Sequence, residues 1–235
     1  QGNASDDPRM ALTQIAWPAD LEAIQILMKA ITDEDPDIRI GAAFTLGRLG
    51  IGAALDSLVR CLTVDSDFDV RAAAAFALGD LGEAGDSRVV KHLKAAWSDT
   101  SGDVETKVAI LRSLGNLRCE GLASIFIEGA SHPEERIRQL AAMGLGSQES
   151  SDAQTCLVNL LRDRSNNVRR IAIGSLAKLA QPKTIAPLIQ SAIDAPAEIR
   201  FAVASALRGY SGETVVHALD TAMGSARVKE RGIAT

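Results

Sequence analysis

Residues 69–79 read DVRAAAAFALG, and this run returns along the chain with small changes, as DIRIGAAFTLG at residues 37–47 and NVRRIAIGSL at residues 167–176. Its leucine recurs at intervals of 32, 36, 31, 31 and 31 residues: Leu46, Leu78, Leu114, Leu145, Leu176 and Leu207. A cation stands seven residues before each leucine: Arg39, Arg71, Lys107, Arg138, Arg169 and Arg200. A fixed period in this range is typical of stacked supersecondary units. The sequence therefore predicts an array of repeats.

Each repeat is predicted to hold two helices. The first helix is clearest at Asp20–Ile31, where apolar residues fall three and four positions apart and so share one helix face. The second helix carries the repeated run and is predicted over six ranges: Asp37–Leu49, Asp69–Leu81, Glu105–Leu117, Glu135–Gly146, Asn167–Leu179 and Glu198–Gly209. Hydrophobic residues make up 46% of the chain and aromatic residues only 3%, so the core has to be built from Ala, Leu, Ile and Val. That mixture favours helix over strand.

We therefore expect an all-α fold: an α-solenoid, or superhelix, of stacked antiparallel helix pairs, with about six full repeats and a partial repeat at each end. The predicted organisation is an N-terminal segment with a partial repeat helix (1–19), one continuous solenoid of six repeats (20–211) and a truncated seventh repeat (212–235). The third repeat is longer, and its excess is predicted to form an extended loop at Trp97–Asp103. The incomplete end repeats have three interpretations: a fragment of a longer repeat protein, ends that pair with something, or short terminal helices that fray.

The runs at residues 37–47, 69–79 and 167–176 resemble the HEAT repeat, and more narrowly the short variant named after phycobilisome (bilin) lyases. The resemblance covers roughly residues 20–223. It implies that aspartates and the repeated cations form a polar ladder within and between repeats, with Arg39, Arg71, Lys107, Arg138, Arg169 and Arg200 as its basic members. It also implies that the second helices line the concave surface of the array. Proteins of this family serve many functions, so the resemblance indicates the fold more strongly than it indicates the function.

Composition limits the classes of function. The chain has 235 residues, with 25 Lys and Arg against 30 Asp and Glu, a net charge of −5. Nucleic-acid binding needs concentrated Lys and Arg, so this balance argues against it as a general role. Three cysteines without metal-ligand spacing favour a reducing, cytoplasm-like compartment. The sequence contains no apolar run near the ~18 residues needed to span a bilayer and no visible signal peptide, so no membrane partner is expected.

Residues suited to catalysis are sparse. The histidines fall in three different repeats, and none is followed by a glutamate: His92, His132 and His217. Cys61 and Cys156 occupy matching apolar positions on first helices and are predicted to fill the core, whereas Cys119 lies in a loop. A nucleophilic cysteine needs a nearby base and a lowered pKa. We therefore predict no catalytic residue, no metal site and no resident cofactor.

The second helix has a face suited to binding. At 100° per residue, positions one before and three, seven and ten after each cation share the core face, and positions one, five and eight after it lie opposite. The predicted groove comprises residues on that opposite face: Ile40, Phe44, Phe76, Val108, Arg112, Gln139, Met143, Arg170, Phe201 and Arg208. Beside Gly47 and Gly79, an apolar groove floored by glycine suits a partner helix or a flat planar ligand. The alternative is that Phe44 and Phe76 pack between neighbouring second helices.

Three hypotheses of function follow. The first is a non-enzymatic protein–protein interaction scaffold that holds another protein in the concave groove. The second rests on the family resemblance and is a bilin-handling protein, either a lyase subunit or a phycobilisome-degradation factor, with a transiently bound tetrapyrrole at Phe76, Arg112 and Met143. The third, ranked last, is nucleic-acid binding through Arg112, Arg170 and Arg208. The uncapped ends of the array also predict self-association.

Overall fold

The helices of the protein come in antiparallel pairs, each made of a first and a second helix. The computed structural model describes residues 18–99 and 103–220, and none of these residues is in a strand. The first helices are α2 (Pro18–Ala30), α4 (Leu55–Val64), α6 (Ser87–Asp99), α8 (Ala123–Ala130), α10 (Ser151–Leu160) and α12 (Ile185–Ala192). The second helices are α3 (Pro36–Arg48), α5 (Phe68–Leu81), α7 (Val104–Leu117), α9 (Glu135–Leu145), α11 (Asn166–Leu179) and α13 (Ala197–Leu207). Short 3-10 helices, η1 (Gly52–Ala54) and η2 (Pro182–Thr184), precede α4 and α12.

These pairs confirm the predicted all-α fold of stacked helix hairpins, and each second helix lies within two residues of its predicted bounds. The predicted partial helix in residues 1–19 lies almost wholly outside the described residues. Of the predicted seventh repeat, residues 212–220 are helical and the remainder also lies outside the described residues.

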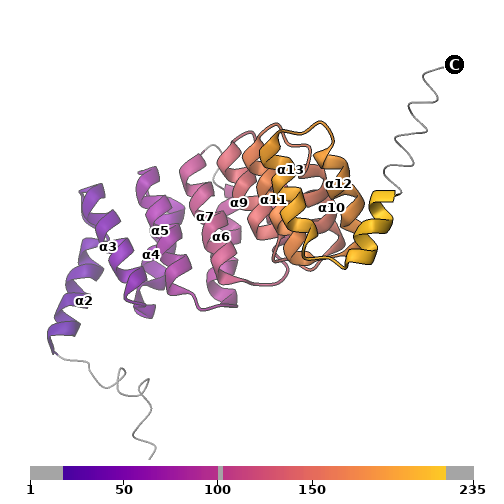
Figure 1. Ribbon diagram of the computed structural model, residues 1–235. Coiled ribbons are helices and arrows are strands. Elements are labelled where there is room, and N and C mark those ends of the chain that lie inside the picture. Colours follow the sequence, from indigo (N-terminus) through magenta and orange to yellow (C-terminus); the bar gives the residue numbers. More distant parts are fainter. Residues whose placement is uncertain (1–17, 100–102, 221–235) are drawn as a thin grey trace, which may run out of the picture. The chain divides into compact units, whose positions relative to one another are not determined.

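The chain divides into two compact units. Unit 1 contains residues 1–83 and 91–113, and unit 2 contains residues 84–90 and 114–235, so the boundary passes through α6 and α7. In unit 1, α3 packs against α5, and α4 packs beside α5 (Figure 1). In unit 2, α11 packs between α9 and α13. The prediction of one continuous solenoid over residues 20–211 stays a prediction.

Each unit has a core built from the repeated apolar positions. Five of the six repeated leucines are fully buried, and Leu207 is half-buried. The residue before the cation is buried on α5, α9, α11 and α13, as predicted for the core face. On α3 the corresponding Ile38 is exposed. Burial of these aliphatic side chains removes apolar surface from water, which is the main favourable contribution to folding.

Short polar side chains cap the start of several second helices. Asp67 Oδ1 accepts hydrogen bonds from the backbone N–H groups of Asp69 (2.8 Å) and Val70 (3.2 Å) at the start of α5. Ser165 Oγ accepts one from the Val168 N–H (3.4 Å) at the start of α11. Such caps satisfy N–H groups that have no partner inside the helix.

The predicted loop at Trp97–Asp103 is wrong over its first three residues. Trp97 to Asp99 belong to α6, and the Trp97 side chain is buried. Lys107 Nζ lies 4.7 Å from the centroid of the Trp97 ring. The large apolar surface of the indole favours burial, which extends the first helix into the stretch assigned to the insertion.

Candidate functional site

Three of the repeated arginines bridge adjacent repeats. Arg138 donates from Nε and Nη2 to the Asp163 carboxylate of the next repeat at 2.8 and 3.0 Å. Its Nη1 donates to the carbonyls of His132 (3.0 Å) and Pro133 (2.8 Å) in the turn before its own helix. One guanidinium thus connects its own turn to the next one, a planar five-donor arrangement that lysine lacks.

The same pattern recurs in unit 1. Arg39 binds the Asp65 carboxylate at 2.8 and 2.9 Å and donates to the carbonyls of Asp33 and Glu34. Arg71 binds Asp103 at 2.8 and 3.2 Å and the carbonyls of Asp65 and Ser66. These three arginines and their aspartates are called the Arg–Asp bridges below.

The bridges also shift the ionisation of their acidic members. Burial alone raises the pKa of Asp163, but the hydrogen bond from Arg138 and that from the Ser165 N–H outweigh it and hold the pKa below its ordinary value. In the same way, burial raises the pKa of Asp65, but the hydrogen bond from Arg39 and smaller electrostatic contributions together outweigh burial, so the pKa is lowered. The carboxylates therefore stay ionised while they order the turns.

The other three cations depart from this pattern. Lys107 faces the Trp97 ring instead of a carboxylate. Arg169 donates to the Asn166 side chain and to the Asp163 carbonyl, while its Nε is buried without a hydrogen-bond partner. Arg200 donates to the Ala195 carbonyl. The ladder drawn from the family resemblance thus has inter-repeat ion pairs at three of its six positions among the described residues.

Gly47 and Gly79, which were predicted to floor an open groove, instead lie where one second helix contacts the next. A Cβ built on Gly47 would lie 2.6 Å from Ala77 Cα, and one built on Gly79 would lie 2.4 Å from Ser113 Oγ. Ser113 Oγ in turn donates to the Ala75 carbonyl at 2.9 Å. In unit 2, Gly146 meets Ser175 in the same way. The glycines therefore permit close approach of consecutive second helices and do not floor an open groove.

In unit 1, the exposed side of the second helices carries an aromatic row, defined as Phe44, Phe76 and Arg112. The two rings are stacked, with centroids 6.3 Å apart and planes at 23°. Arg112 Cζ lies 5.7 Å from the centroid of the Phe76 ring. Phe44 is 39% exposed and Phe76 is half-buried, so the rings both pack on one another and reach solvent.

Two other predicted groove residues of unit 1 are less accessible. Ile40 is half-buried, and Val108 is only 6% exposed. Including Val108 in an open groove was therefore wrong, because its side chain is taken up by packing in the interior.

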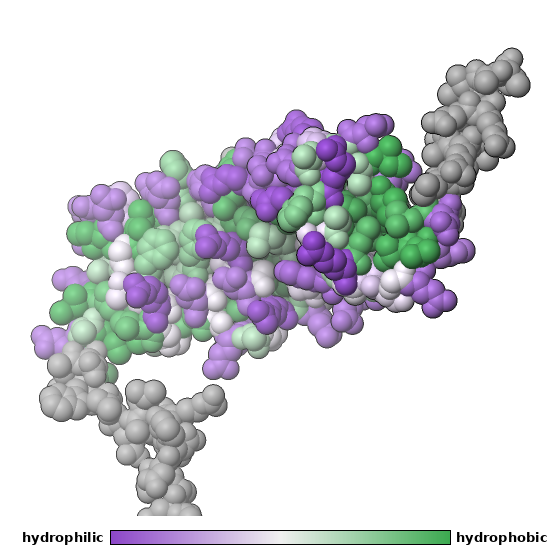
Figure 2. All heavy atoms as spheres, in the orientation of Figure 1, coloured by the Kyte–Doolittle hydropathy of each residue, from purple (hydrophilic) through white to green (hydrophobic). Residues whose placement is uncertain are grey.

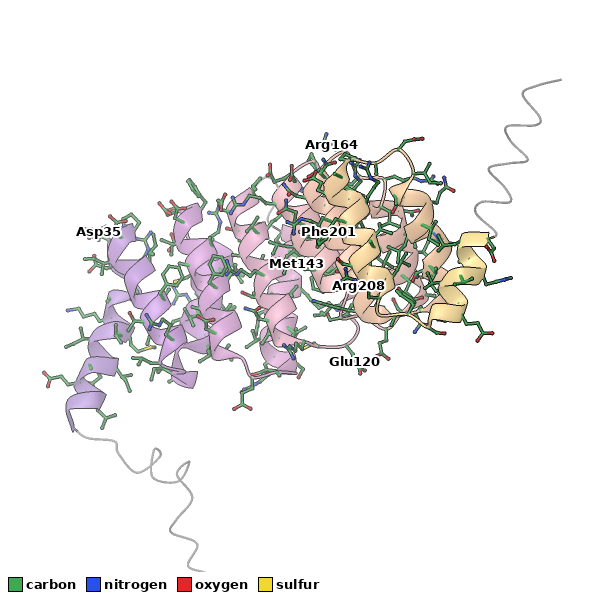
Figure 3. The ribbon with its side chains drawn as sticks, in the orientation of Figure 1. Asp35, Glu120, Met143, Arg164, Phe201 and Arg208 are labelled. Atoms are coloured by element: carbon green, nitrogen blue, oxygen red, sulfur yellow. The ribbon has the colours of Figure 1, made fainter. Side chains whose placement is uncertain are left out.

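In unit 2, the predicted groove residues are more open. Met143 on α9 is 56% exposed and Phe201 on α13 is 70% exposed. Arg170 and Arg208 are exposed, and Gln139 is half-buried with its Nε2 donating to Glu135 at 2.8 Å. Figure 3 shows Met143, Phe201 and Arg208 between Arg164 at one edge of this unit and Glu120 at the other. Figure 2 shows hydrophobic and hydrophilic atoms side by side over α9, α11 and α13.

Two columns of this face are absent from the predicted groove: the residues nine after the cation, such as Lys178, and those two before it. Residues two before the cation lie seven positions from those five after it, two helical turns along the same side. In unit 1 this column is acidic, with Asp37 and Asp69 exposed. In unit 2 it reads Arg136, Asn167 and Glu198, all exposed. The seven-residue spacing was the available signal. The second-helix face below means the positions two before and one, five, eight and nine after each cation.

The described residues give little support for catalytic chemistry. Burial raises the pKa of the Cys61 and Cys156 thiols, which disfavours the nucleophilic thiolate. Cys61 is buried as predicted, but Cys156 is only half-buried and lines a hollow with Ile127 and Asn159. Within residues 18–99 and 103–220, no cluster of three or more His, Cys, Asp or Glu side chains is arranged to hold a metal ion. None of the helices described combines the length and apolarity needed to span a bilayer.

Paired helices, inter-repeat contacts and an exposed second-helix face define an α-solenoid repeat protein. The chain matches the family model for HEAT repeats over residues 4–79 and 123–208, and the model for the PBS lyase HEAT-like repeat over residues 70–97. The chain belongs to the HEAT-repeat family, as its sequence resemblance indicated.

Solved structures share this fold. The X-ray structure of Escherichia coli YibA superposes with a TM-score of 0.62 at 17% identity, covering 85% of this chain and 81% of that one. A designed armadillo repeat protein in complex with the peptide (KR)4 gives a TM-score of 0.56 at 16% identity, covering 80% and 99%. An engineered protein gives 0.56 at 20% identity, covering 79% and 97%. Among curated proteins, no sequence match was found.

Proposed function

We propose that this protein is a non-enzymatic interaction scaffold that binds a segment of another protein on its second-helix face. One observation carries the proposal: large apolar side chains are exposed on that face, although the same helices bury the apolar residues of their other side. Met143 and Phe201 are the clearest cases. Soluble proteins expose few such groups together except at binding sites, where apolar and charged residues are mixed. The complex of a designed armadillo repeat protein with a peptide supports the general mode of binding.

Selection from a peptide library tests the proposal. The full chain is immobilised and presented with a random phage-displayed library, and the peptides recovered are synthesised with a fluorescent label. We expect Phe44→Ser, Met143→Ser and Phe201→Ser to weaken one or more of these peptides at least tenfold, a change of about 1.4 kcal/mol.

Matched controls come from exposed apolar residues at the C-terminal ends of first helices. Val64, the last residue of α4, and Ile193, which follows α12, are both exposed. Val64→Ser and Ile193→Ser should leave affinity within about twofold, because surface substitutions away from a binding site have small effects. Loss of binding in the controls alone contradicts the proposal.

Bilin handling is a second candidate, favoured by the aromatic row and by the match to the PBS lyase HEAT-like repeat. Stacked Phe44 and Phe76 offer a flat apolar seat, and Arg112 offers a cation for a propionate. Met143, the third residue of the hypothesis, belongs to unit 2. Titration with phycocyanobilin should change its absorbance spectrum, and Phe76→Ser should remove the change; an unaltered spectrum with the unmodified protein rules the candidate out.

Two further predictions remain untested. Self-association through the repeat ends concerns residues that lie largely outside the described ranges. Nucleic-acid binding by Arg112, Arg170 and Arg208 is the weakest of the three hypotheses, because Arg112 shares the exposed side of the second helices of unit 1 with the carboxylates of Asp37 and Asp69.

A further inference from the structure

The second-helix face of unit 2 carries more positive than negative charge. Its exposed cations are Arg136, Arg170, Lys178 and Arg208. The carboxylates on or beside it are Glu135 and Glu198. Four cations against two carboxylates make this face basic, although the whole chain has a net charge of −5.

Both carboxylates are already hydrogen-bonded by neighbouring amides. Glu135 Oε1 accepts from Gln139 Nε2 at 2.8 Å and from Asn167 Nδ2 at 3.3 Å. Glu198 accepts from the Asn166 side chain. These contacts hold the carboxylates near the N-terminal ends of α9 and α13, where the helix dipole also favours negative charge.

Three of the cations have no such partner. Within the described part of the chain, the side chains of Arg170, Lys178 and Arg208 form no hydrogen bond or ion pair. Arg170 and Lys178 come from α11, and Arg208 directly follows α13. Their charges are available to a ligand.

Apolar groups flank these cations on the neighbouring helices. Met143 projects from α9 and Phe201 from α13 (Figure 3), and α11 packs between these helices. At the level of Met143, α11 presents Gly174, and a Cβ built there would meet nothing within 4 Å. The space over Gly174 is therefore open, with Met143 at the same level on α9 and Phe201 one helical turn earlier on α13.

Building on the proposed function, we infer that this face selects an acidic segment of a partner protein. Its Asp and Glu side chains pair with Arg170, Lys178 and Arg208, while an aliphatic or aromatic side chain enters the open space over Gly174 and contacts the exposed Met143 and Phe201. Arginine favours this ligand, because its guanidinium binds a carboxylate through two parallel hydrogen bonds. The apolar contacts supply the desolvated centre that such interfaces need.

A nucleic acid fits this face less well. Phosphate backbones require several cations in succession, and Glu135 and Glu198 put negative charge at the N-terminal ends of α9 and α13. The exposed thioether of Met143 has no charge or hydrogen-bond donor with which to bind a phosphate.

The composition of the peptides selected on the full chain tests this inference. We expect those that lose affinity in Met143→Ser or Phe201→Ser to be enriched in Asp and Glu, with at least one large apolar residue. Their affinity should fall as NaCl is raised, since exposed charges are screened over about 10 Å at 0.1 M salt.

Charge reversal makes the test quantitative. The double variant Arg170→Glu/Arg208→Glu should weaken the best acidic peptide by at least tenfold and improve binding of the same peptide with its acids changed to Lys. The control double variant Arg162→Glu/Lys183→Glu changes two exposed cations outside the face, on the turn before α11 and in η2, and should change affinity by less than about twofold.

The outcomes separate this inference from the proposed function. If face-dependent peptides are neutral or basic, or if charge reversal leaves affinity unchanged, the acidic preference is wrong and the scaffold function stands. If no peptide depends on the second-helix face, both are wrong. A 20-nucleotide single-stranded DNA that binds more tightly than the best peptide and competes with it replaces the inference with nucleic-acid binding.

Discussion

Arg138 shows how one side chain can connect two neighbouring repeats. The Arg138 and Asp163 side chains are 6% and 8% exposed, and four of the five guanidinium donors bond to the carboxylate on one side and to two carbonyls on the other. A buried pair of this kind adds little relative to an apolar substitute, but removing one partner leaves the other charge uncompensated. The bridges are therefore sites where single substitutions should be costly.

Arg138→Ala is expected to lower the free energy of unfolding by about 3 kcal/mol, the cost of leaving a buried charge without its partner. Lys107→Ala removes only a contact with the Trp97 ring and should cost about 1 kcal/mol. Urea denaturation followed by far-UV circular dichroism measures both. Equal losses in the two variants contradict the role given to the Arg–Asp bridges.

Acid should destabilise the protein through the same carboxylates. The folded-state pKa of Asp163 lies below its ordinary value, so its contribution to stability is present above the unfolded pKa of about 3.9 and is lost as pH falls through the folded pKa. Stability should fall most steeply below about pH 4, and Asp163→Asn should flatten that decline. The thermal midpoint of the unmodified protein and of Asp163→Asn is measured from pH 2 to 7. The same slope in both proteins contradicts the role of Asp163 in acid destabilisation.

Phe76 can be assigned by substitution either to the core or to the binding surface. The ring is half-buried and stacked on Phe44, yet it lies on the side of α5 opposite the fully buried Leu78. Phe76→Glu should leave the far-UV helix signal intact while abolishing binding of any peptide that Phe44→Ser weakens. An unfolded variant assigns Phe76 to the core instead.

At the scale of the element, the glycines set how closely consecutive second helices approach. Gly47 and Gly79 place backbone against Ala77 and Ser113 at distances that any side chain would violate. Glycine is otherwise unfavourable inside a helix by roughly 0.5–1 kcal/mol relative to alanine, so its presence there needs a packing reason.

Two glycines of α3 give a matched comparison. Gly41→Ala meets nothing within 4 Å and should stabilise the protein by about 0.5–1 kcal/mol. Gly47→Ala places a methyl group against the Ala77 backbone and should destabilise it by about 1–3 kcal/mol. Thermal denaturation of the two variants checks the difference in sign. A stability change of the same sign in both variants means that the contact of Gly47 with Ala77 does not exclude a side chain.

At the scale of the molecule, the sequence predicted what the repeats share and missed what is particular to one of them. The leucines and the aliphatic residues that precede most of the cations were predictable, because most hairpins need the same buried contacts. Trp97 was assigned to a loop because the insertion after it interrupts the period, although its indole is buried at the end of α6. Gly47 was interpreted as an open floor because a single helix does not show which helix approaches it.

The candidate site was predictable to a similar extent. Helical spacing alone identified Met143 and Phe201, whose exposure the structure supplies. It also admitted Val108, which neighbouring side chains bury, and omitted Lys178 and the column containing Asn167. Exposure depends on contacts between repeats, and the spacing within one repeat does not contain that information.

Photo-crosslinking locates a bound peptide on the protein. A selected peptide carrying a benzophenone group at its apolar position is irradiated with the full chain, and the attachment sites are mapped by mass spectrometry. We expect attachment on the second helices, at Met143 or at residues of α11 and α13. Attachment confined to the first helices α8, α10 and α12 means that the peptide does not bind the second-helix face.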